Sequence, residues 1–203
     1  MQTVCAAGET VPGYDVSSYQ DVSVHAQQAA AGAKFCFIKA EEGFNEDPKF
    51  VAHWAAAKAA GMFTGAYNFF HPSVDPIAQA QKFKAIVGPI GPGDLGPVID
   101  WESTDGVPPF QDMNDGFNFL TALQSEYGRG PIVYSAAYFI EAMSLDDRFL
   151  AFPLWVANYG VRCPLVPAPW KYWSFWQYGT QNNILDMDVF NGSYDRLKLM
   201  AGL

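Results

Sequence analysis

Short apolar runs alternate with helix-like stretches along the whole chain. The runs are rich in Val, Ile, Phe and Tyr, and their length is typical of buried strands. The predicted strands are residues 13–16, 33–40, 63–70, 96–101, 131–134, 153–157, 173–178 and 185–190. The stretches between them predict helices at residues 22–31, 48–60, 76–87, 112–127 and 136–143.

Two of these helices carry recognisable start signals. Asp47 before Pro48, and Asp75 before Pro76, place an N-capping side chain ahead of a proline at the first helical position. Gly61 follows the last turn of the first of these helices, where a residue without a Cβ is favoured. Both segments are therefore predicted to be helices, with their first turns at the prolines.

Strands that alternate with helices predict right-handed βαβ units and a largely parallel α/β sheet. A small, irregular (β/α) barrel and a doubly wound sheet both fit this order of elements. At 203 residues the chain has the length of one domain. We expect a single domain over residues 1–203, with its core at about residues 11–200.

Composition and charge narrow the class of protein. Half of the residues are hydrophobic and 16% are aromatic, which excludes a disordered chain. The formal net charge of −9 disfavours nucleic acid as a partner, because phosphate backbones attract basic surfaces. No run of about 18 apolar residues predicts a membrane span, and the first residues lack the pattern of a secretory signal.

The three cysteines do not form a full disulfide framework, because their number is odd. Cys36 lies inside an apolar run and is expected to be a small buried thiol. Cys5 and Cys163 are able to pair in an oxidising compartment, although their spacing alone leaves this open. No Cys or His spacing indicates zinc, so we expect neither a metal nor another cofactor.

Acidic residues gather at the ends of three predicted strands. Asp15 ends the first run, Asp100 and Glu102 close the fourth, and Asp186 and Asp188 lie in the last. The carboxyl ends of parallel strands form the functional face of an α/β fold. One such residue is usually a cap or turn residue, but three separate runs ending in acids favour an acid/base hydrolase.

Asp100 and Glu102 are two positions apart, so on a strand their side chains point to the same face. Their Cα atoms are then about 6.5–7 Å apart. Like charges held close in a partly dry site raise one pKa, and the protonated partner can act as a general acid. A pair of this kind is also able to bind a divalent cation through its oxygen atoms.

Aromatic residues in or just after the apolar runs favour a sugar ligand, because flat rings pack against the C–H faces of sugars. Core packing is the alternative role for most of them. They are Tyr67, Phe69, Tyr134, Trp155, Tyr159, Trp173, Trp176 and Tyr178. Lys39, Asn158 and Gln177 lie beside them and are able to bond hydroxyl groups or an acetamido carbonyl.

These features together resemble the glycoside hydrolase family 25 muramidases, also called Chalaropsis-type lysozymes. The resemblance runs in collinear order over roughly residues 11 to 200. It rests on GYDVS at residues 13–17 with Gln20, FIKAEEG at 37–43, GAYNFFHP at 65–72, VIDWE at 98–102, PIVY at 131–134, LWVA at 154–157, FWQY at 175–178 and LDMDVFNG at 185–192.

The resemblance implies an irregular, TIM-barrel-like (β/α) barrel with about eight strands and fewer helices. It also implies hydrolysis of the β-1,4 bond between N-acetylmuramic acid and N-acetylglucosamine. By position, Glu102 resembles the general acid and Asp100 its partner, while Asp15 and Asp186 resemble two further acids in the cleft. The substrate-contacting positions expected by resemblance or by chemistry are Glu42, Lys39, Tyr67, Tyr134, Trp155, Gln177 and Asp188.

Two positions depart from the family pattern. Glu41 stands where a small hydroxyl residue is usual, and Asn68 stands where His is frequent. Both are predicted to lie near the cleft, so the departures are expected to bear on sugar preference.

Two mechanisms are compatible with these residues. In one, Glu102 protonates the leaving oxygen and the substrate's own acetamido group attacks, with Asp100 orienting it; in the other, a carboxylate activates water with inversion. The position of Asp100 and Glu102 on one face of one strand favours the mechanism assisted by the acetamido group. The rival classes are a binding barrel without activity, which the presence of all four acids disfavours, and a metal-dependent hydrolase.

The expected partner is the glycan strand of peptidoglycan. We expect the protein to be a monomer that acts on the cell wall and does not insert into a membrane. The isoelectric point near 4.6 indicates action at low pH or no use of charge steering toward an anionic wall.

Overall fold

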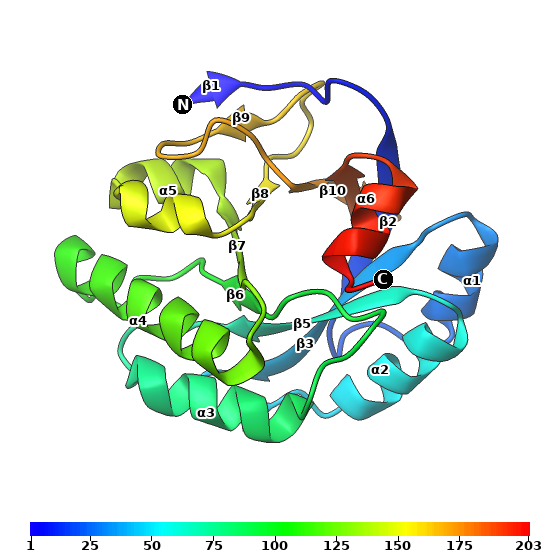
Figure 1. The fold of residues 1–203 in the computed structure, drawn as a ribbon, viewed down its shortest axis with the longest axis horizontal. Helices are drawn as coiled ribbons and strands as arrows, with labels where there is room; N and C mark the ends of the chain where they lie inside the picture. Colours follow the sequence, from blue (N-terminus) through cyan, green and yellow to red (C-terminus); the bar gives the residue numbers. More distant parts are fainter.

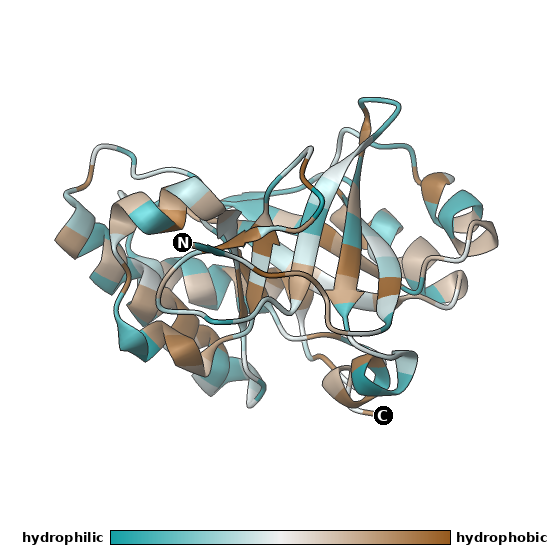
Figure 2. Ribbon diagram, turned by 90° about the horizontal axis from the view of Figure 1, so that it is seen from above, coloured by the Kyte–Doolittle hydropathy of each residue, from teal (hydrophilic) through white to brown (hydrophobic).

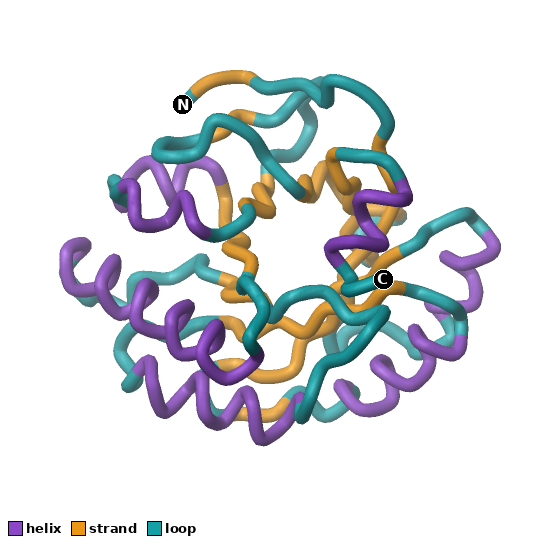
Figure 3. Tube along the Cα trace, viewed as in Figure 1, coloured by secondary structure: helices purple, strands orange, loops and turns teal.

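The structure, a computed structural model that describes residues 1–203, is a closed barrel of eight strands (Figures 1 and 3). The strands are β2 (Thr10–Val16), β3 (Phe35–Glu42), β5 (Phe63–Phe69), β6 (Val98–Asp100), β7 (Ile132–Ala136), β8 (Leu154–Ala157), β10 (Phe175–Gln181) and β11 (Leu185–Asn191). Strand β2 pairs with β3 on one side and with β11 on the other, so the sheet closes on itself. The predicted barrel is confirmed, and the doubly wound sheet is excluded.

Seven of the eight strands run parallel, and β11 alone is reversed. It is antiparallel to both of its neighbours, β10 and β2. A tight hairpin joins β10 to β11, so no helix crosses over between them. This reversal brings the amino-terminal end of β11, which carries Asp186, to the carboxyl end of β2, where Asp186 pairs with Asp15.

The helices cover only one side of the barrel (Figure 1). They are α1 (Val24–Ala30), α2 (Phe50–Ala59), α3 (Pro76–Val87), α4 (Pro109–Tyr127) and α5 (Ala137–Met143), followed by a short 3-10 helix at Asp147–Ala151. On the other side, no helix directly follows β8 or β10. There, the chain start forms β1 (Gln2–Thr3), which pairs with β9 (Leu165–Val166) in a separate two-stranded sheet.

The helix predictions hold except at their ends. Asp75 caps α3 as expected, because its side chain accepts a hydrogen bond from the Ala78 amide at 2.8 Å. The expectation that a helix starts at Pro48 is wrong, since α2 begins two residues later at Phe50. Asp47 instead is buried and accepts a hydrogen bond from the Ser18 amide at 2.9 Å, which ties this turn to the loop after β2.

Large aromatic rings fill the barrel interior, and glycines make room for them. Phe37 stacks on Trp155 with their ring centroids 4.2 Å apart. A Cβ at Gly13 would lie 2.4 Å from the Phe35 ring, and one at Gly65 would lie 2.5 Å from the Phe37 ring. Real Cβ atoms do not approach other atoms this closely, so the two glycines are required by the packing of two phenylalanines.

A sixth helix closes one end of the barrel. Helix α6 (Tyr194–Met200) was not predicted, because seven residues after a glycine carry little periodic signal. Its Leu197 is fully buried and, with Ala201, belongs to the interior cluster of 14 residues that includes Phe35 and Phe63. These phenylalanines begin strands β3 and β5, so the end with the strands' carboxyl termini is the one that stays open.

The layer outside the barrel wall is a second, larger cluster of 32 buried hydrophobic residues between the strands and the helices. Figure 2 shows hydrophobic and hydrophilic residues interleaved along the helices, as expected for helices with one buried face. None of the helices has the length and apolar character needed to cross a membrane.

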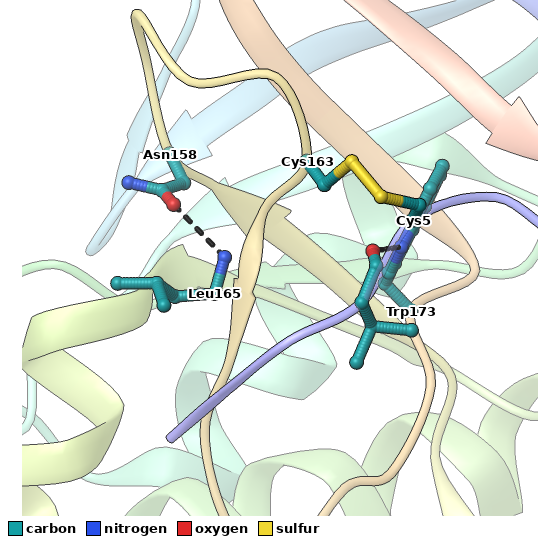
Figure 4. The surroundings of a disulfide bond; sticks show 6 residues. Cys5, Asn158, Cys163, Leu165 and Trp173 are labelled. Atoms are coloured by element: carbon teal, nitrogen blue, oxygen red, sulfur yellow. Dashed lines mark hydrogen bonds between the residues drawn. A yellow bond between two sulfur atoms is a disulfide. The ribbon is translucent and has the colours of Figure 1, made fainter.

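A disulfide joins Cys5 to Cys163 and fastens the amino-terminal arm to the loop after β8 (Figure 4). The pairing that the sequence left open is therefore present. Beside it, the Trp173 indole donates a hydrogen bond to the Val4 carbonyl at 2.7 Å, which holds the arm on the barrel. Cys36 is a buried free thiol, as predicted.

Candidate active site

A cavity of about 170 Å³ opens at the carboxyl ends of the barrel strands. Nine of the eleven site residues expected from the sequence line it, namely Asp15, Lys39, Tyr67, Asp100, Glu102, Tyr134, Trp155, Gln177 and Asp186. They lie in β2, β3, β5, β6, β7, β8, β10 and β11, or in the case of Glu102 just after β6, so every barrel strand contributes to the lining. The remaining lining residues are Ser17, Tyr19 and Phe69.

The cavity brings together four carboxyl groups that are far apart in the chain. Asp15 and Asp186 are opposite each other on the paired strands β2 and β11. Asp100 is the last residue of β6, and Glu102 follows it on the same face. Asp15 and Asp100 are 7% and 6% exposed, whereas Glu102 is exposed at the cavity mouth. Of the Asp100–Glu102 pair, Glu102 is therefore the carboxyl that a ligand meets first.

Burial makes all four carboxyl groups harder to ionise. Burial, reinforced by the Asp186 charge, raises the pKa of Asp15 to about 7. Burial also raises the pKa of Asp186 above its usual range. For Asp100, burial and then the nearby Glu102 carboxylate raise the pKa well above its ordinary value. The cavity therefore holds protons on carboxyl groups at a pH where exposed carboxyl groups have lost them.

Asp100 and Glu102 affect each other's ionisation. Burial raises the pKa of Glu102 as well, although a hydrogen bond from Asp100 partly offsets the rise. The Asp100 Oδ1 atom has no hydrogen-bond partner in the protein, and a buried anion without partners is costly. Without a substrate, this environment favours a neutral Asp100 that donates a hydrogen bond to Glu102. The pKa values observed in a titration then describe the Asp100–Glu102 pair and not either residue alone.

Gln177 fixes the orientation of Asp15. Its Nε2 donates a hydrogen bond to Asp15 Oδ2 at 2.7 Å, and its Oε1 accepts one from the Tyr134 hydroxyl at 2.7 Å. The Tyr159 hydroxyl also donates to Gln177 Oε1. Because two hydroxyl donors occupy the amide oxygen, the amide nitrogen is left to face Asp15. Tyr159 is one of the aromatics that favour a sugar ligand in the sequence, but it is not one of the predicted site residues.

Asp188 does not reach the cavity surface. Its side chain is fully buried, and its Oδ1 accepts a hydrogen bond from the Trp155 indole nitrogen at 2.8 Å. The expected direct contact with substrate is therefore corrected: Asp188 lies behind the cavity wall and orients Trp155. Asp186 and Asp188 share the inward face of β11, but this reversed strand runs away from the cavity, so Asp188, which pairs with Gly13, lies deeper in the barrel than Asp186, which pairs with Asp15.

Glu42 lies just outside the cavity and acts on it through Lys39. The Lys39 ammonium forms an ion pair with Glu42 and lies 5.1 Å from the centre of the Phe69 ring. Glu42 also lies 3.6 Å from His71 Nε2, and His71 Nδ1 is 2.8 Å from Asp105. This row of polar contacts holds the loops after β3, β5 and β6 against each other.

The cavity continues as a groove on both sides. A hollow of about 290 Å³ beside it is lined by Tyr19, Lys39 and Glu42. A second hollow of about 280 Å³ is lined by Glu102, Asn158 and Tyr159. An elongated groove with the acids at its middle is suited to an extended, polymeric ligand.

Glu41 and Asn68, the two departures from the family pattern, do not lie in the cleft. Both side chains are fully buried on the outer face of the barrel wall, where Asn68 donates a hydrogen bond to Glu41. The prediction that they lie near the cleft is wrong, because β3 has an irregular register between Lys39 and Glu41 that turns Glu41 outward. The two unusual residues partner each other.

Ser17 and Tyr19 line the cavity and were not predicted, and Phe69 was named only among the aromatics that favour a sugar ligand. Ser17 and Phe69 lie two positions beyond Asp15 and Tyr67, so the alternation along a strand was a usable signal for both. Tyr19 is on a loop and 86% exposed, and nothing in the sequence pattern marks it. No group of three or more His, Cys, Asp or Glu side chains is arranged to hold a metal ion.

A closed barrel with a carboxyl-rich groove at the strands' carboxyl ends defines a barrel hydrolase of the glycosidase type. The sequence profile of the family described as "Glycosyl hydrolases family 25" matches residues 14–187. The chain belongs to this family and is a glycoside hydrolase.

Individual proteins of known name agree with this membership. The N,O-diacetylmuramidase of Chalaropsis sp. is 32% identical, over 95% of this chain and 99% of that protein. A muramidase structure from Trichobolus zukalii is 33% identical and superposes with a TM-score of 0.88, covering 94% of this chain and 98% of that one. A bacterial lysozyme from Streptomyces coelicolor gives a TM-score of 0.89 at 30% identity, covering 94% and 96%.

Proposed function

We propose that this chain, as one catalytic domain over residues 1–203, is a muramidase that cleaves the β-1,4 bond between N-acetylmuramic acid and N-acetylglucosamine in peptidoglycan. The observation that carries the proposal is the meeting of Asp15, Asp100, Glu102 and Asp186 in one groove. The names of the similar proteins, muramidase and lysozyme, support the same substrate.

Glu102 is the general acid in this proposal. Its carboxyl is exposed at the groove and shares a proton with Asp100, so it is able to protonate the glycosidic oxygen as the C–O bond breaks. As the shared proton leaves through Glu102, Asp100 becomes negatively charged. The Asp100 carboxylate then accepts a hydrogen bond from the N–H of the substrate's acetamido group and orients it.

The acetamido carbonyl oxygen attacks the anomeric carbon from the face opposite the leaving group and forms a cyclic oxazolinium ion. Water then attacks the same carbon, reopens the ring and gives its proton to the Glu102 carboxylate. Asp15, which Gln177 holds in place, and Asp186 stabilise the positive charge that develops on the sugar ring. Two displacements at one carbon retain its configuration.

The stereochemistry of the first product tests this route. Proton NMR during hydrolysis of a muramyl oligosaccharide is expected to show the β anomer first, with the α anomer growing in only through mutarotation. An α anomer as the initial product would replace the assisted route with direct attack of water and inversion.

We further propose that the protein works outside the reducing cytoplasm, whether secreted or delivered there. The Cys5–Cys163 disulfide supports this location, because such bonds persist in oxidising compartments. We also propose a monomer, with no nucleic acid or membrane partner. Light scattering coupled to size-exclusion chromatography is expected to give a mass near 22.3 kDa, and twice that mass would contradict it.

A further inference from the structure

A second hollow lies on the outside of the barrel, on the side without helices. It measures about 440 Å³, against about 170 Å³ for the catalytic cavity. Strand β10 separates the two: Gln177 lines the catalytic cavity, whereas its neighbours Trp176 and Tyr178 line the outer hollow. Because successive side chains of a strand point to opposite faces, this placement follows from the strand itself.

The outer hollow is built from segments that are fastened to one another. The Cys5–Cys163 disulfide forms part of its wall, and Trp173 forms another part (Figure 4). The Trp176 indole donates a hydrogen bond to the Asn158 carbonyl at 2.9 Å, as the Trp173 indole does to the arm. With both N–H groups used inside the protein, the indoles present ring carbon atoms to the hollow.

Arg162 gives the hollow a positive charge without a partner. Its side chain is exposed and makes no hydrogen bond or ion pair, in a chain with 21 acidic residues and a net charge of −9. Arg148, by contrast, pairs with Asp146 at 2.9 Å. A guanidinium beside aromatic rings binds a carboxylate through paired N–H donors, while the rings accept the C–H face of a sugar.

We propose that this hollow is a second, non-catalytic binding site for a carboxylate-bearing muramyl unit. Its sugar ring packs on Trp176 and Tyr178, and its lactyl or peptide carboxylate pairs with Arg162. The identity of the ligand rests on the proposed function, because it is taken from the same polymer that the groove would cleave.

The position of the hollow fits a polymer that extends beyond the groove. The loop after β8 contributes Asn158 and Tyr159 to the groove and Arg162 and Cys163 to the outer hollow. Three residues of chain span at most about 11 Å, so the two sites are close neighbours on either side of this loop. Holding a wall strand at a second point raises the effective concentration of further strands at the groove.

Titration with two monosaccharides tests the site directly. N-acetylmuramic acid carries a carboxylate, and N-acetylglucosamine is the same ring without the lactyl group. In ¹⁵N NMR, N-acetylmuramic acid is expected to shift the indole signals of Trp173 and Trp176, and N-acetylglucosamine to shift them at about tenfold higher concentration. Equal responses to the two sugars, or no response at these indoles, would overturn the proposal.

Variants then separate this site from the groove. Arg162→Gln is expected to abolish the preference for N-acetylmuramic acid, and Arg162→Lys to restore part of it. Arg148→Gln, which removes an exposed arginine elsewhere, serves as the matched control. Tyr178→Ala is expected to weaken the binding of both sugars, because it removes the aromatic ring on which they pack. An Arg162→Gln protein that keeps the wild-type preference contradicts the assignment.

Activity measurements keep the two proposals distinguishable. Arg162→Gln is expected to hydrolyse a short soluble muramyl tetrasaccharide at the wild-type rate, yet to sediment with insoluble peptidoglycan about tenfold less well. If the wild type cleaves neither substrate, the proposed function fails, whereas the NMR titration still decides the outer site. If Arg162→Gln sediments as the wild type does, the outer site plays no part in wall binding.

Discussion

The catalytic cavity and the layer outside the barrel wall each contain a buried carboxyl that resists ionisation. Burial raises the pKa of Asp15 to about 7 in the cavity, and burial raises the pKa of Glu41 to about 8 in the outer layer. The surroundings differ: Asp15 lines a groove that a ligand can enter, whereas Glu41 is sealed between the strands and helices with Asn68. A perturbed pKa therefore marks a functional residue only where the group also meets open space.

The largest effect is expected from a matched pair of substitutions across these two regions. Glu102→Gln removes the general acid and should lower kcat about 10²–10⁴-fold, the usual share of general acid catalysis. Glu41→Gln, the same chemical change outside the cavity, should leave kcat within about twofold. Hydrolysis of a soluble muramyl oligosaccharide measures both, and thermal unfolding controls for folding. Comparable losses of kcat in the two variants would contradict the distinction between the cavity carboxyl and the carboxyl in the outer layer.

The pH dependence of activity should show the shared proton of the cavity pair. Asp100 and Glu102 both have a pKa raised by burial, and the reaction needs the pair to hold a proton. We expect kcat/KM to fall about tenfold per pH unit on the alkaline side, with the midpoint above 4.5, the ordinary value of a glutamate. A midpoint at or below 4.5 would contradict a raised pKa for the pair.

Gln177→Ala should change the pKa of Asp15 and reduce hydrolysis without abolishing it. The hydrogen bond from Gln177 lowers the pKa of Asp15, in opposition to burial. Its removal should therefore raise the apparent pKa of Asp15 and lower kcat about tenfold, because the carboxylate form loses its donor. Tyr134→Phe is the companion variant, since it removes only a donor to the Gln177 oxygen and should have the smaller effect.

The smallest effect concerns stability alone. Because the pKa of Glu41 is raised to about 8 in the folded protein from 4.5, the folded state binds more protons between these values. The stability that this group contributes is complete below about pH 4.5 and is lost as the pH rises through about 8. Between these pH values the free energy of unfolding should fall by up to about 1.4 kcal/mol per pH unit because of Glu41, and Glu41→Gln should remove this dependence. Urea unfolding at several pH values measures it. A slope identical to the wild type would show that Glu41 ionises normally.

The strands, their order and the acids at their ends were predictable, because short apolar runs and strand-end carboxyl groups are local signals. The reversal of β11 was not, and it is what sets Asp186 opposite Asp15. The sequence also did not predict where the strand pairing is irregular or how deep in the barrel each strand residue lies. Irregular pairing of β3 moved Glu41 to the outer face. The reversed direction of β11 placed Asp188 deeper in the barrel, against Trp155, although both positions looked close to the site in the sequence.

Residues that depend on a distant partner also escaped prediction. Tyr159 matters through Gln177, 18 positions away, and α6 was missed because its role is to close the barrel with Leu197. The Cys5–Cys163 pairing joins residues 158 positions apart, which only the fold brings together.

The central claim is that Asp100 and Glu102 hold a proton between them that ordinary carboxyl groups would have lost. Carbon-13 NMR of the side-chain carboxyl groups, titrated in the free protein, reads this out without substrate. The account predicts that both signals change above the usual carboxyl range and that Glu102→Gln alters the titration of Asp100. Two independent titrations at ordinary values would contradict it.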